Sequence, residues 1–203
     1  MEALCHLRRM IASLDETLVD ALGARSRLGF DPAFYALPAD ALPGLNELAG
    51  AFADSATPAG RVRVLRPAFL LGMLPGLCAG APDNGPAPCL AADAACLNAL
   101  ARRLALSVHV ATRKREAVPD DLQAALNTRD PARIEAAITH AGVESEVLSR
   151  VRTRAGDPSG DPGLPDRIAQ LYADWIIPLS RKIQVHGLLA DAGGEPAPPL
   201  SRM

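Results

Sequence analysis

Hydrophobic residues recur at every third or fourth position along three long segments of this chain, the spacing of a single buried helix face. In residues 2–28 that face consists of Leu4, Leu7, Ile11, Leu14, Leu18 and Leu22. Residues 91–116 and 166–190 repeat the pattern, and Pro178 lies inside the last of them. The spacing therefore predicts three long amphipathic helices, the last one kinked at the proline.

Two shorter helices are predicted between the second and third long ones. Asp130 followed by Pro131 is typical of a helix N-cap with proline in the first turn, so we expect a helix over 131–138. Apolar residues at helical spacing indicate another over 141–154.

Residues 29–90 lack this regular spacing, because prolines and glycines interrupt the hydrophobic pattern repeatedly. Short helical patches are predicted around 40–54 and 66–78, and the sequence APDNGPAP at 81–88 predicts a loop. We interpret 29–90 as an insert packed on a helical core.

Two further stretches are rich in glycine and proline. The centre of 155–165 and the tail 192–203 are both expected to be disordered. Residues 1–191 are then a single domain, of which the insert is a part.

Composition supports this organisation. The chain has 203 residues, enough for one domain with a hydrophobic core. Aromatic residues make up only 3%, whereas alanine and leucine dominate, which favours an all-α fold over a sheet. The formal net charge of −2 provides no field that would attract nucleic acid or an anionic membrane.

Targeting and metal-binding patterns are not evident. The N-terminus resembles no signal peptide and no apolar run reaches about 18 residues, so a cytoplasmic protein without a membrane span is expected. The cysteines, which are Cys5, Cys78, Cys89 and Cys96, form no CxxC pair, so we expect reduced thiols and no metal site.

Several charged or polar residues lie beside the apolar faces. They are Arg8, Arg103, Lys114, Glu144, Ser180 and Gln184. Arg103 and Lys114 are eleven residues apart and project from nearly the same side of their helix, and Ser180 and Gln184 are helical neighbours. Each alone is typical of a surface charge or a satisfied polar pair.

Common catalytic motifs are missing. The histidines have no evident carboxylate or serine partner, and GxSxG, HExxH, P-loop and GxGxxG motifs do not occur in a suitable context. Covalent, metal-dependent and nucleotide-dependent chemistries are therefore disfavoured, and no cofactor is expected.

Three separated segments resemble one known family. They are LRRMIASLDETLVDALGAR at 7–25, ADAACLNALARRLALSVHVATRK at 92–114 and LYADWIIPLSRKIQVHGLL at 171–189. In this order they resemble the helical chorismate mutases, and specifically the eukaryotic-type branch of fungi and plants. The resemblance covers most of 4–28 and 90–191. It implies a helical bundle with an inserted helical segment, forming a homodimer that converts chorismate to prephenate.

The resemblance also implies roles for individual residues. Arg8 and Arg103 match arginines that hold the two substrate carboxylates, and Ser180 matches a residue that hydrogen-bonds to a carboxylate. Lys114 matches a lysine that contacts a carboxylate and the ether oxygen, and Gln184 matches the second donor to the ether oxygen. No nucleophile is required, because the reaction is an intramolecular rearrangement that depends on positioning and on donors to the developing negative charge.

Two other positions concern the substrate hydroxyl. Glu144 matches the glutamate that binds it. His140 occupies a position where relatives have Asn or Asp near the hydroxyl, so it is included among the substrate-binding residues.

The chain departs from its relatives at Gln184, where many of them have glutamate. An amide donates a hydrogen bond without being protonated, so we expect little loss of activity between about pH 6 and 8. A second departure lies in the insert. Regulated relatives bind tyrosine or tryptophan through an arginine pair, a Gly-Ser and a Thr, whereas this chain has Ala87, Pro88 and Ala91 there and no arginine pair in 45–58. Weak or absent aromatic amino-acid regulation is expected.

Other interpretations stay open. The same bundle could host an isochorismate pyruvate lyase, although those chains are short and lack this insert. A catalytically silent homologue could instead regulate a shikimate-pathway enzyme, or the bundle could be unrelated. Whether the product feeds aromatic amino acids or a specialised compound is also open.

Overall fold

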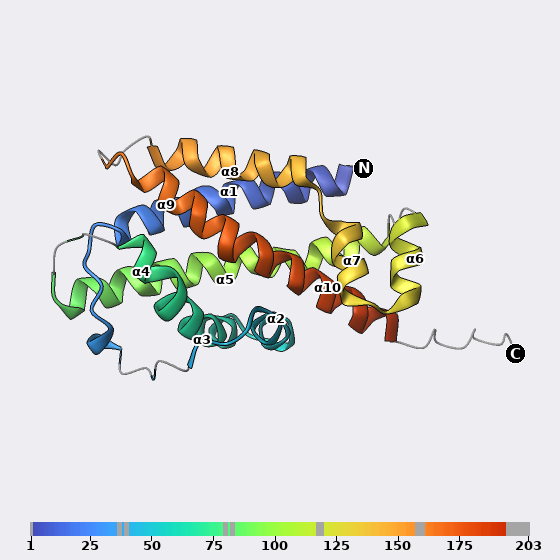
Figure 1. Ribbon diagram of the computed structural model, residues 1–203, viewed down its shortest axis with the longest axis horizontal. Coiled ribbons are helices and arrows are strands. Elements are labelled where there is room, and N and C mark those ends of the chain that lie inside the picture. The colour runs from blue at the N-terminus through green and yellow to red at the C-terminus, as the bar shows by residue number, and fades with distance from the viewer. Residues whose placement is uncertain are drawn as a thin grey trace, which may run out of the picture.

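A computed structural model describes residues 2–35, 38, 41–78, 81, 84–116, 120–156 and 161–193. Within these ranges the chain is built from helices and connecting turns, with no strand (Figure 1). The all-α prediction is confirmed.

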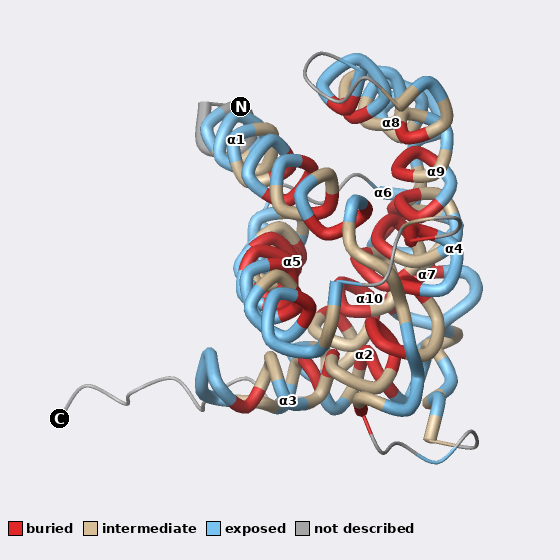
Figure 2. Tube along the Cα trace, turned by 90° about the vertical axis from the view of Figure 1, so that its left-hand side faces the viewer, coloured by how far each residue is buried: buried red, intermediate tan, exposed pale blue. Residues whose placement is uncertain are grey.

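Long helices form the framework of the bundle. They are α1 (Glu2–Arg25), α5 (Pro86–Glu116), α8 (Ala141–Gly156) and the continuous segment of α9 (Leu164–Leu171), η4 (Tyr172–Ile176) and α10 (Ile177–Gly193). Helix α1 packs along α5 and also contacts α8, while α10 crosses α5 (Figures 1 and 2). The three long predicted helices thus lie against one another, as a shared apolar core requires.

The insert supplies a second layer. It contains η1 (Pro32–Phe34), α2 (Leu45–Asp54), α3 (Pro58–Ala68), η3 (Phe69–Met73) and α4 (Leu74–Leu77). Helix α2 packs on α10 and α3 packs on α5. The predicted patch at 66–78 began too late, because Thr57 caps α3 by accepting a hydrogen bond from the Gly60 amide at 3.0 Å.

Two short helices, α6 (Asp120–Thr128) and α7 (Pro131–Ile138), close the other end of the molecule. They enclose a small second core with the ends of α5 and α10. The N-cap prediction for Asp130 is confirmed, since its carboxylate accepts from the Ala132 amide at 2.9 Å.

The start of α5 differs from the sequence prediction. The helix begins at Pro86, so Pro86 to Pro88 belong to it and not to a loop. Prolines are compatible with a first turn because the amide hydrogens there have no helical acceptor.

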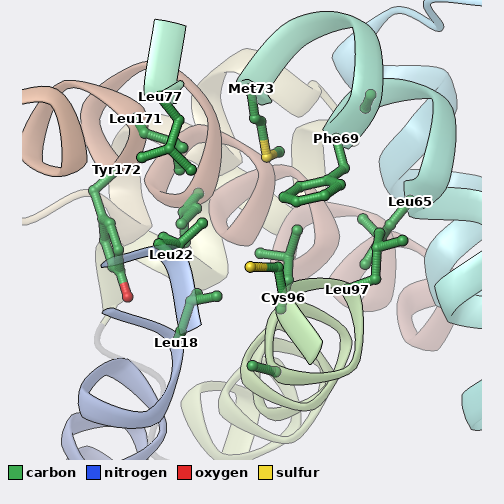
Figure 3. Packing of buried hydrophobic residues seen from close by; sticks show 14 of the residues in the cluster. Leu18, Leu22, Leu65, Phe69, Met73, Leu77, Cys96, Leu97, Leu171 and Tyr172 are labelled. Carbon is green, nitrogen blue, oxygen red and sulfur yellow. The ribbon is translucent and has the colours of Figure 1, made fainter. Parts of the chain in front are cut away.

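The main core joins α1, α3, η3, α5 and η4. Figure 3 shows Phe69 and Met73 from the insert facing Cys96 and Leu97 of α5. Tyr172 extends along the edge of this cluster toward α1 (Figure 3). The insert therefore shares its core with the helices that carry the candidate site residues.

Both long segments that carry internal prolines contain a π-helical turn. The turn η3 ends two residues before Pro75, and η4 ends two residues before Pro178. A proline ring clashes with the carbonyl four residues earlier in an α-helix, and the wider π turn accommodates it. A kink was predicted at Pro178, and the structure has a widened turn there within a continuous helix.

The two π turns touch each other through Gly72 and Trp175. A Cβ atom at position 72 would overlap the six-membered ring of Trp175, so the indole requires glycine at this close approach. Because Gly72 belongs to the insert, this contact links the insert to the helix that carries Ser180 and Gln184.

A buried ion pair joins α1 to the start of α5. The Nε of Arg25 donates to Asp93 Oδ1, and the Tyr35 hydroxyl donates to Asp93 Oδ2 at 2.6 Å. The remaining nitrogens of Arg25 donate to the Leu28 carbonyl, the Cys78 sulfur and the Tyr35 hydroxyl. Burial would lower the pKa of Arg25, but these partners together raise it, so the guanidinium stays charged.

Some predictions concern residues outside the described ranges. The predicted disordered tail 192–203 starts too early, because α10 continues to Gly193; its remainder and the centre of the 155–165 segment lie outside the described ranges. The division into one domain with an insert remains a prediction.

Candidate active site

One face of α5 carries three polar side chains between its apolar positions. Arg103, Ser107 and Lys114 are four and seven residues apart, so they lie along one stripe of the helix. Arg103 and Ser107 are buried, and Lys114 is partly buried. This stripe contacts groups from α1, α7 and α10.

Arg103 is held by a buried carboxylate from α1. Its Nε donates to Asp15 Oδ1 at 2.7 Å. Asp15 also accepts from Arg150 Nη2 at 2.7 Å and from the Tyr172 hydroxyl at 3.1 Å. Two guanidinium groups thus share one carboxylate, which leaves an excess positive charge. The Nη1 of Arg103 is buried and has no hydrogen-bond partner among the described residues.

Lys114 lies in a weakly solvated environment. Its ammonium donates to the carbonyl of Ile138, at the end of α7, at 3.1 Å. Burial, reinforced by the positive charge of nearby Arg8 and opposed by Glu144, lowers the pKa of Lys114 to about 8. The charges of Arg8 on α1 and Glu144 on α8 therefore act directly on the lysine.

Ser180 and Gln184 are neighbours on α10, and both are buried. The Ser180 hydroxyl lies 2.8 Å from that of Ser107. The Nε2 of Gln184 donates to the Ser180 carbonyl at 3.1 Å and to the Ser180 hydroxyl at 3.4 Å, and its Oε1 has no partner among the described residues. An amide nitrogen carries two hydrogens, and the contact at 3.4 Å is long, so a closer acceptor can take that hydrogen from the Ser180 hydroxyl.

Glu144, in the first turn of α8, is bound from α10. Its Oε1 accepts from Arg181 Nη1 at 2.6 Å. His140 precedes α8, and its side chain is exposed. The structure shows His140 at the margin of this region without bringing it into the buried polar set.

The arrangement suits a small dianion. Cationic donors outnumber nearby carboxylates around Arg103 and Lys114, and a buried guanidinium nitrogen without a partner has a strong tendency to bind an anion. The uncharged donors of Ser180 and Gln184 lie on the facing helix. Such a set can hold carboxylates and stabilise negative charge on an oxygen.

Several residues of this region were missed by sequence reasoning. They are Asp15, Ser107, Arg150, Tyr172 and Arg181. Asp15 could have been found, since it falls on the apolar face between Ile11 and Leu18, where a charge requires a partner. Arg150 and Arg181 have no comparable pattern, because arginines are ordinary on exposed helix faces.

An open groove of about 680 Å³ runs beside α8, lined by Glu16, Arg150, Thr153, Arg154 and Gly156. Of the residues that line this groove, only Arg150 also contacts the buried polar residues around Arg103, through Asp15. The buried donors lie elsewhere, so we place the candidate site at α1, α5, α8 and α10.

Part of the chain matches one known family. The family model of type II chorismate mutase matches residues 90–185, a segment that contains all the predicted catalytic residues except Arg8. The chain is similar in sequence to chorismate mutases of fungi and plants. A chorismate mutase of Pichia angusta is 32% identical over 130 residues, which cover 58% of this chain and 46% of that protein. The chain thus spans about half the length of the curated chorismate mutases it matches.

Solved chorismate mutases share the fold. The chloroplast enzyme of Zea mays superposes with a TM-score of 0.76 at 19% identity, covering 95% of this chain and 96% of that one. The Candida albicans enzyme, in complex with L-Trp, gives a TM-score of 0.70 at 22% identity, covering 93% and 91%. These similarities support the fungal and plant type of helical bundle.

The residues that the structure describes contain neither a membrane-spanning helix nor a candidate metal-binding cluster. Every helix there is too short or too polar to cross a lipid bilayer. No group of three or more His, Cys, Asp or Glu side chains in those ranges could hold a metal ion.

Proposed function

We propose that this protein is a chorismate mutase that rearranges chorismate to prephenate, for aromatic amino-acid or specialised aromatic biosynthesis. One observation carries the proposal. Around Arg103 and Lys114, on one face of α5, the positive charges exceed the negative charges of the neighbouring carboxylates. Chorismate brings two carboxylates. The match of residues 90–185 to the model of type II chorismate mutase supports this assignment of the substrate.

The first task of the site is to hold the dianion in a compact pose. Arg103 Nη1, buried and without a partner, is oriented by Asp15 and can bind one carboxylate. Arg8 binds the other, and the Ser180 hydroxyl contributes a further hydrogen bond. Holding both ends of a flexible substrate reduces the entropy that the reaction would otherwise lose in the transition state.

The second task is to stabilise charge on the ether oxygen as its bond to carbon breaks. We assign this to the Lys114 ammonium and to the amide hydrogen of Gln184 that makes the long contact with the Ser180 hydroxyl. A donor of this kind contributes about 3–4 kcal/mol to the transition state in a preorganised site. Glu144 accepts a hydrogen bond from the substrate hydroxyl, with His140 beside it. No step requires a cofactor or a covalent intermediate.

Three further properties are part of the proposal. The protein acts in the cytoplasm and forms a homodimer. Aromatic amino acids regulate it weakly or not at all, because the residues that hold them in regulated relatives are replaced at Ala87, Pro88 and Ala91. A several-fold rate change with submillimolar tyrosine or tryptophan would contradict this last point.

The test follows the loss of chorismate absorbance with purified wild type, Lys114→Ala and Gln184→Ala, and identifies prephenate as product. We expect turnover by the wild type and a loss of roughly 100-fold or more in each variant. A folded wild type that leaves chorismate unchanged would overturn the proposal. Turnover of isochorismate to a pyruvate-releasing product, or tight binding to a shikimate-pathway enzyme, would then identify the alternative.

A further inference from the structure

Arg181 connects three helices at the edge of the candidate site. It follows Ser180 on α10, and its Nη1 donates to Glu144 Oε1 on α8 at 2.6 Å. Its Nε lies 3.3 Å from Glu135 Oε1 on α7. Lys182 completes the group, with its Nζ 3.4 Å from Glu135 Oε2.

This group differs from the ion pairs on the outer surface. The side chains of Arg181, Glu135 and Glu144 are each about a quarter exposed, at 24%, 26% and 28%. By contrast, Arg152 and Asp166 are 55% and 77% exposed, and neither belongs to the candidate site. The Arg181–Glu144 pair is partly shielded from water, so its electrostatic interaction is stronger than that of an exposed pair. Because Glu144 is the proposed acceptor for the substrate hydroxyl, this pair can affect catalysis.

Two cations interact with Glu144. Arg181 holds its Oε1 by a direct hydrogen bond, and the charge of Lys114 acts on it from α5. No described residue donates to Oε2 of Glu144. If Arg181 were absent, the carboxylate would be free to turn toward Lys114 and neutralise the ammonium.

We propose that Arg181 is a positioning residue that fixes Glu144 in place, so that Oε2 accepts the substrate hydroxyl while the Lys114 ammonium stays available for the ether oxygen. The inference rests on the proposed mutase function. Arg181 acts through Glu144 and needs no contact with substrate. Its loss therefore affects both hydroxyl binding and the chemical step.

The test compares wild type, Arg181→Met, Arg181→Lys, Glu144→Gln and the double variant of Arg181→Met with Glu144→Gln. Arg152→Met is the matched control, because it removes another interhelical arginine–carboxylate pair, at 2.9 Å, away from the site. Each protein is first checked for its helical content and thermal unfolding, and Arg181→Lys serves if Arg181→Met does not fold.

We expect Arg181→Met to lower kcat/KM roughly 10- to 100-fold, with kcat and KM both affected. Arg181→Lys should recover part of the loss, and Arg152→Met should stay within about twofold of wild type. The double variant should be no worse than Glu144→Gln alone, because both substitutions remove the same interaction. A substrate analogue without the ring hydroxyl should show a smaller Arg181→Met penalty.

The two proposals fail in different ways. A wild type without chorismate turnover overturns the proposed function. An active wild type with an impaired Glu144→Gln, but with Arg181→Met indistinguishable from Arg152→Met, overturns the positioning role alone. Fully multiplicative effects of Arg181→Met and Glu144→Gln would likewise show that Arg181 does not act through Glu144.

Discussion

Two buried arginine–aspartate pairs join α1 to α5, and their local chemistry is closely parallel. At one end Arg25 donates through Nε to Asp93, and at the other Arg103 donates through Nε to Asp15. In each case a tyrosine hydroxyl also donates to the aspartate, from Tyr35 or Tyr172. The pairs run in opposite directions, since the arginine is on α1 in the first and on α5 in the second.

The difference lies in the donors that remain. Every nitrogen of Arg25 has a partner within the protein, including carbonyls and a sulfur. The buried Nη1 of Arg103 has no hydrogen-bond partner among the described residues, and Asp15, to which Arg103 donates, also accepts from Arg150. A saturated buried ion pair contributes to structure, whereas one with unused donors has the capacity to bind a ligand.

The largest expected effect breaks the saturated pair. Arg25→Met leaves the buried carboxylate of Asp93 without its cation, which typically costs about 3–5 kcal/mol of the free energy of unfolding. Urea unfolding measures this loss. The kcat/KM per folded molecule, determined at low temperature, should remain near that of wild type. A stable but inactive Arg25→Met would contradict the comparison.

Arg103→Met should have the reverse signature. The substitution removes the proposed carboxylate ligand, so kcat/KM for chorismate should fall roughly 100- to 1,000-fold. Asp15 keeps Arg150 and Tyr172, so the free energy of unfolding should fall less than in Arg25→Met. Paired kinetic and urea measurements on the two variants test this crossover. Equal losses of stability would show that Arg103 is mainly structural.

A third effect follows from the pKa of Lys114, about 8. The charged form is the proposed donor, so kcat/KM should fall as pH rises through about 8, by up to tenfold per unit. Bound dianion favours the ammonium, so the fall in kcat should occur at higher pH. Lys114→Gln has no such titration and provides the control for the pH profile.

Stability should change in the opposite direction with pH. An unfolded lysine titrates near about 10.4, so between about pH 8 and 10.4 the unfolded chain binds more protons than the folded one. The contribution of Lys114 to the free energy of unfolding therefore rises with pH across this window. Urea unfolding at about pH 8 and about pH 10.4 gives the change in the free energy of unfolding with pH, which should be smaller in Lys114→Gln than in wild type. An equal change in both proteins would refute the assignment.

The smallest effects concern the two tyrosines. Tyr35→Phe leaves Asp93 Oδ2 without its donor and should cost about 1–3 kcal/mol. Tyr172→Phe removes a longer bond to an aspartate that keeps two arginines, so about 0.5–1.5 kcal/mol is expected. Thermal unfolding of both variants measures the difference. A larger loss in Tyr172→Phe would reverse the comparison.

Periodicity was sufficient to predict the long helices, because the spacing of leucines such as Leu18 and Leu22 reflects burial directly. It could not place the start of α5, because prolines at 86 and 88 are typical of loops as well as of first helical turns. The polar set around Arg103 was predicted only in part. Sequence spacing shows which side chains share a helix face. It does not show that Asp15 binds Arg150, which is 135 residues away, as well as Arg103.

The π turn at 172–176 has a consequence for how such a chain can change in evolution. A wider turn accommodates one more residue than an α-helical turn, so it serves as a site where a single codon can be gained or lost. Deleting one residue from this turn would restore an α-helical turn and leave Ser180 and Gln184 in nearly the same orientation, whereas the same deletion in a regular α-helix would rotate them by about 100° around the helix axis. A residue can therefore be gained or lost at this turn while Tyr172 stays on Asp15 and the Ser180 and Gln184 side of the helix keeps its orientation, and the packing of Trp175 on Gly72 fixes the turn against the insert.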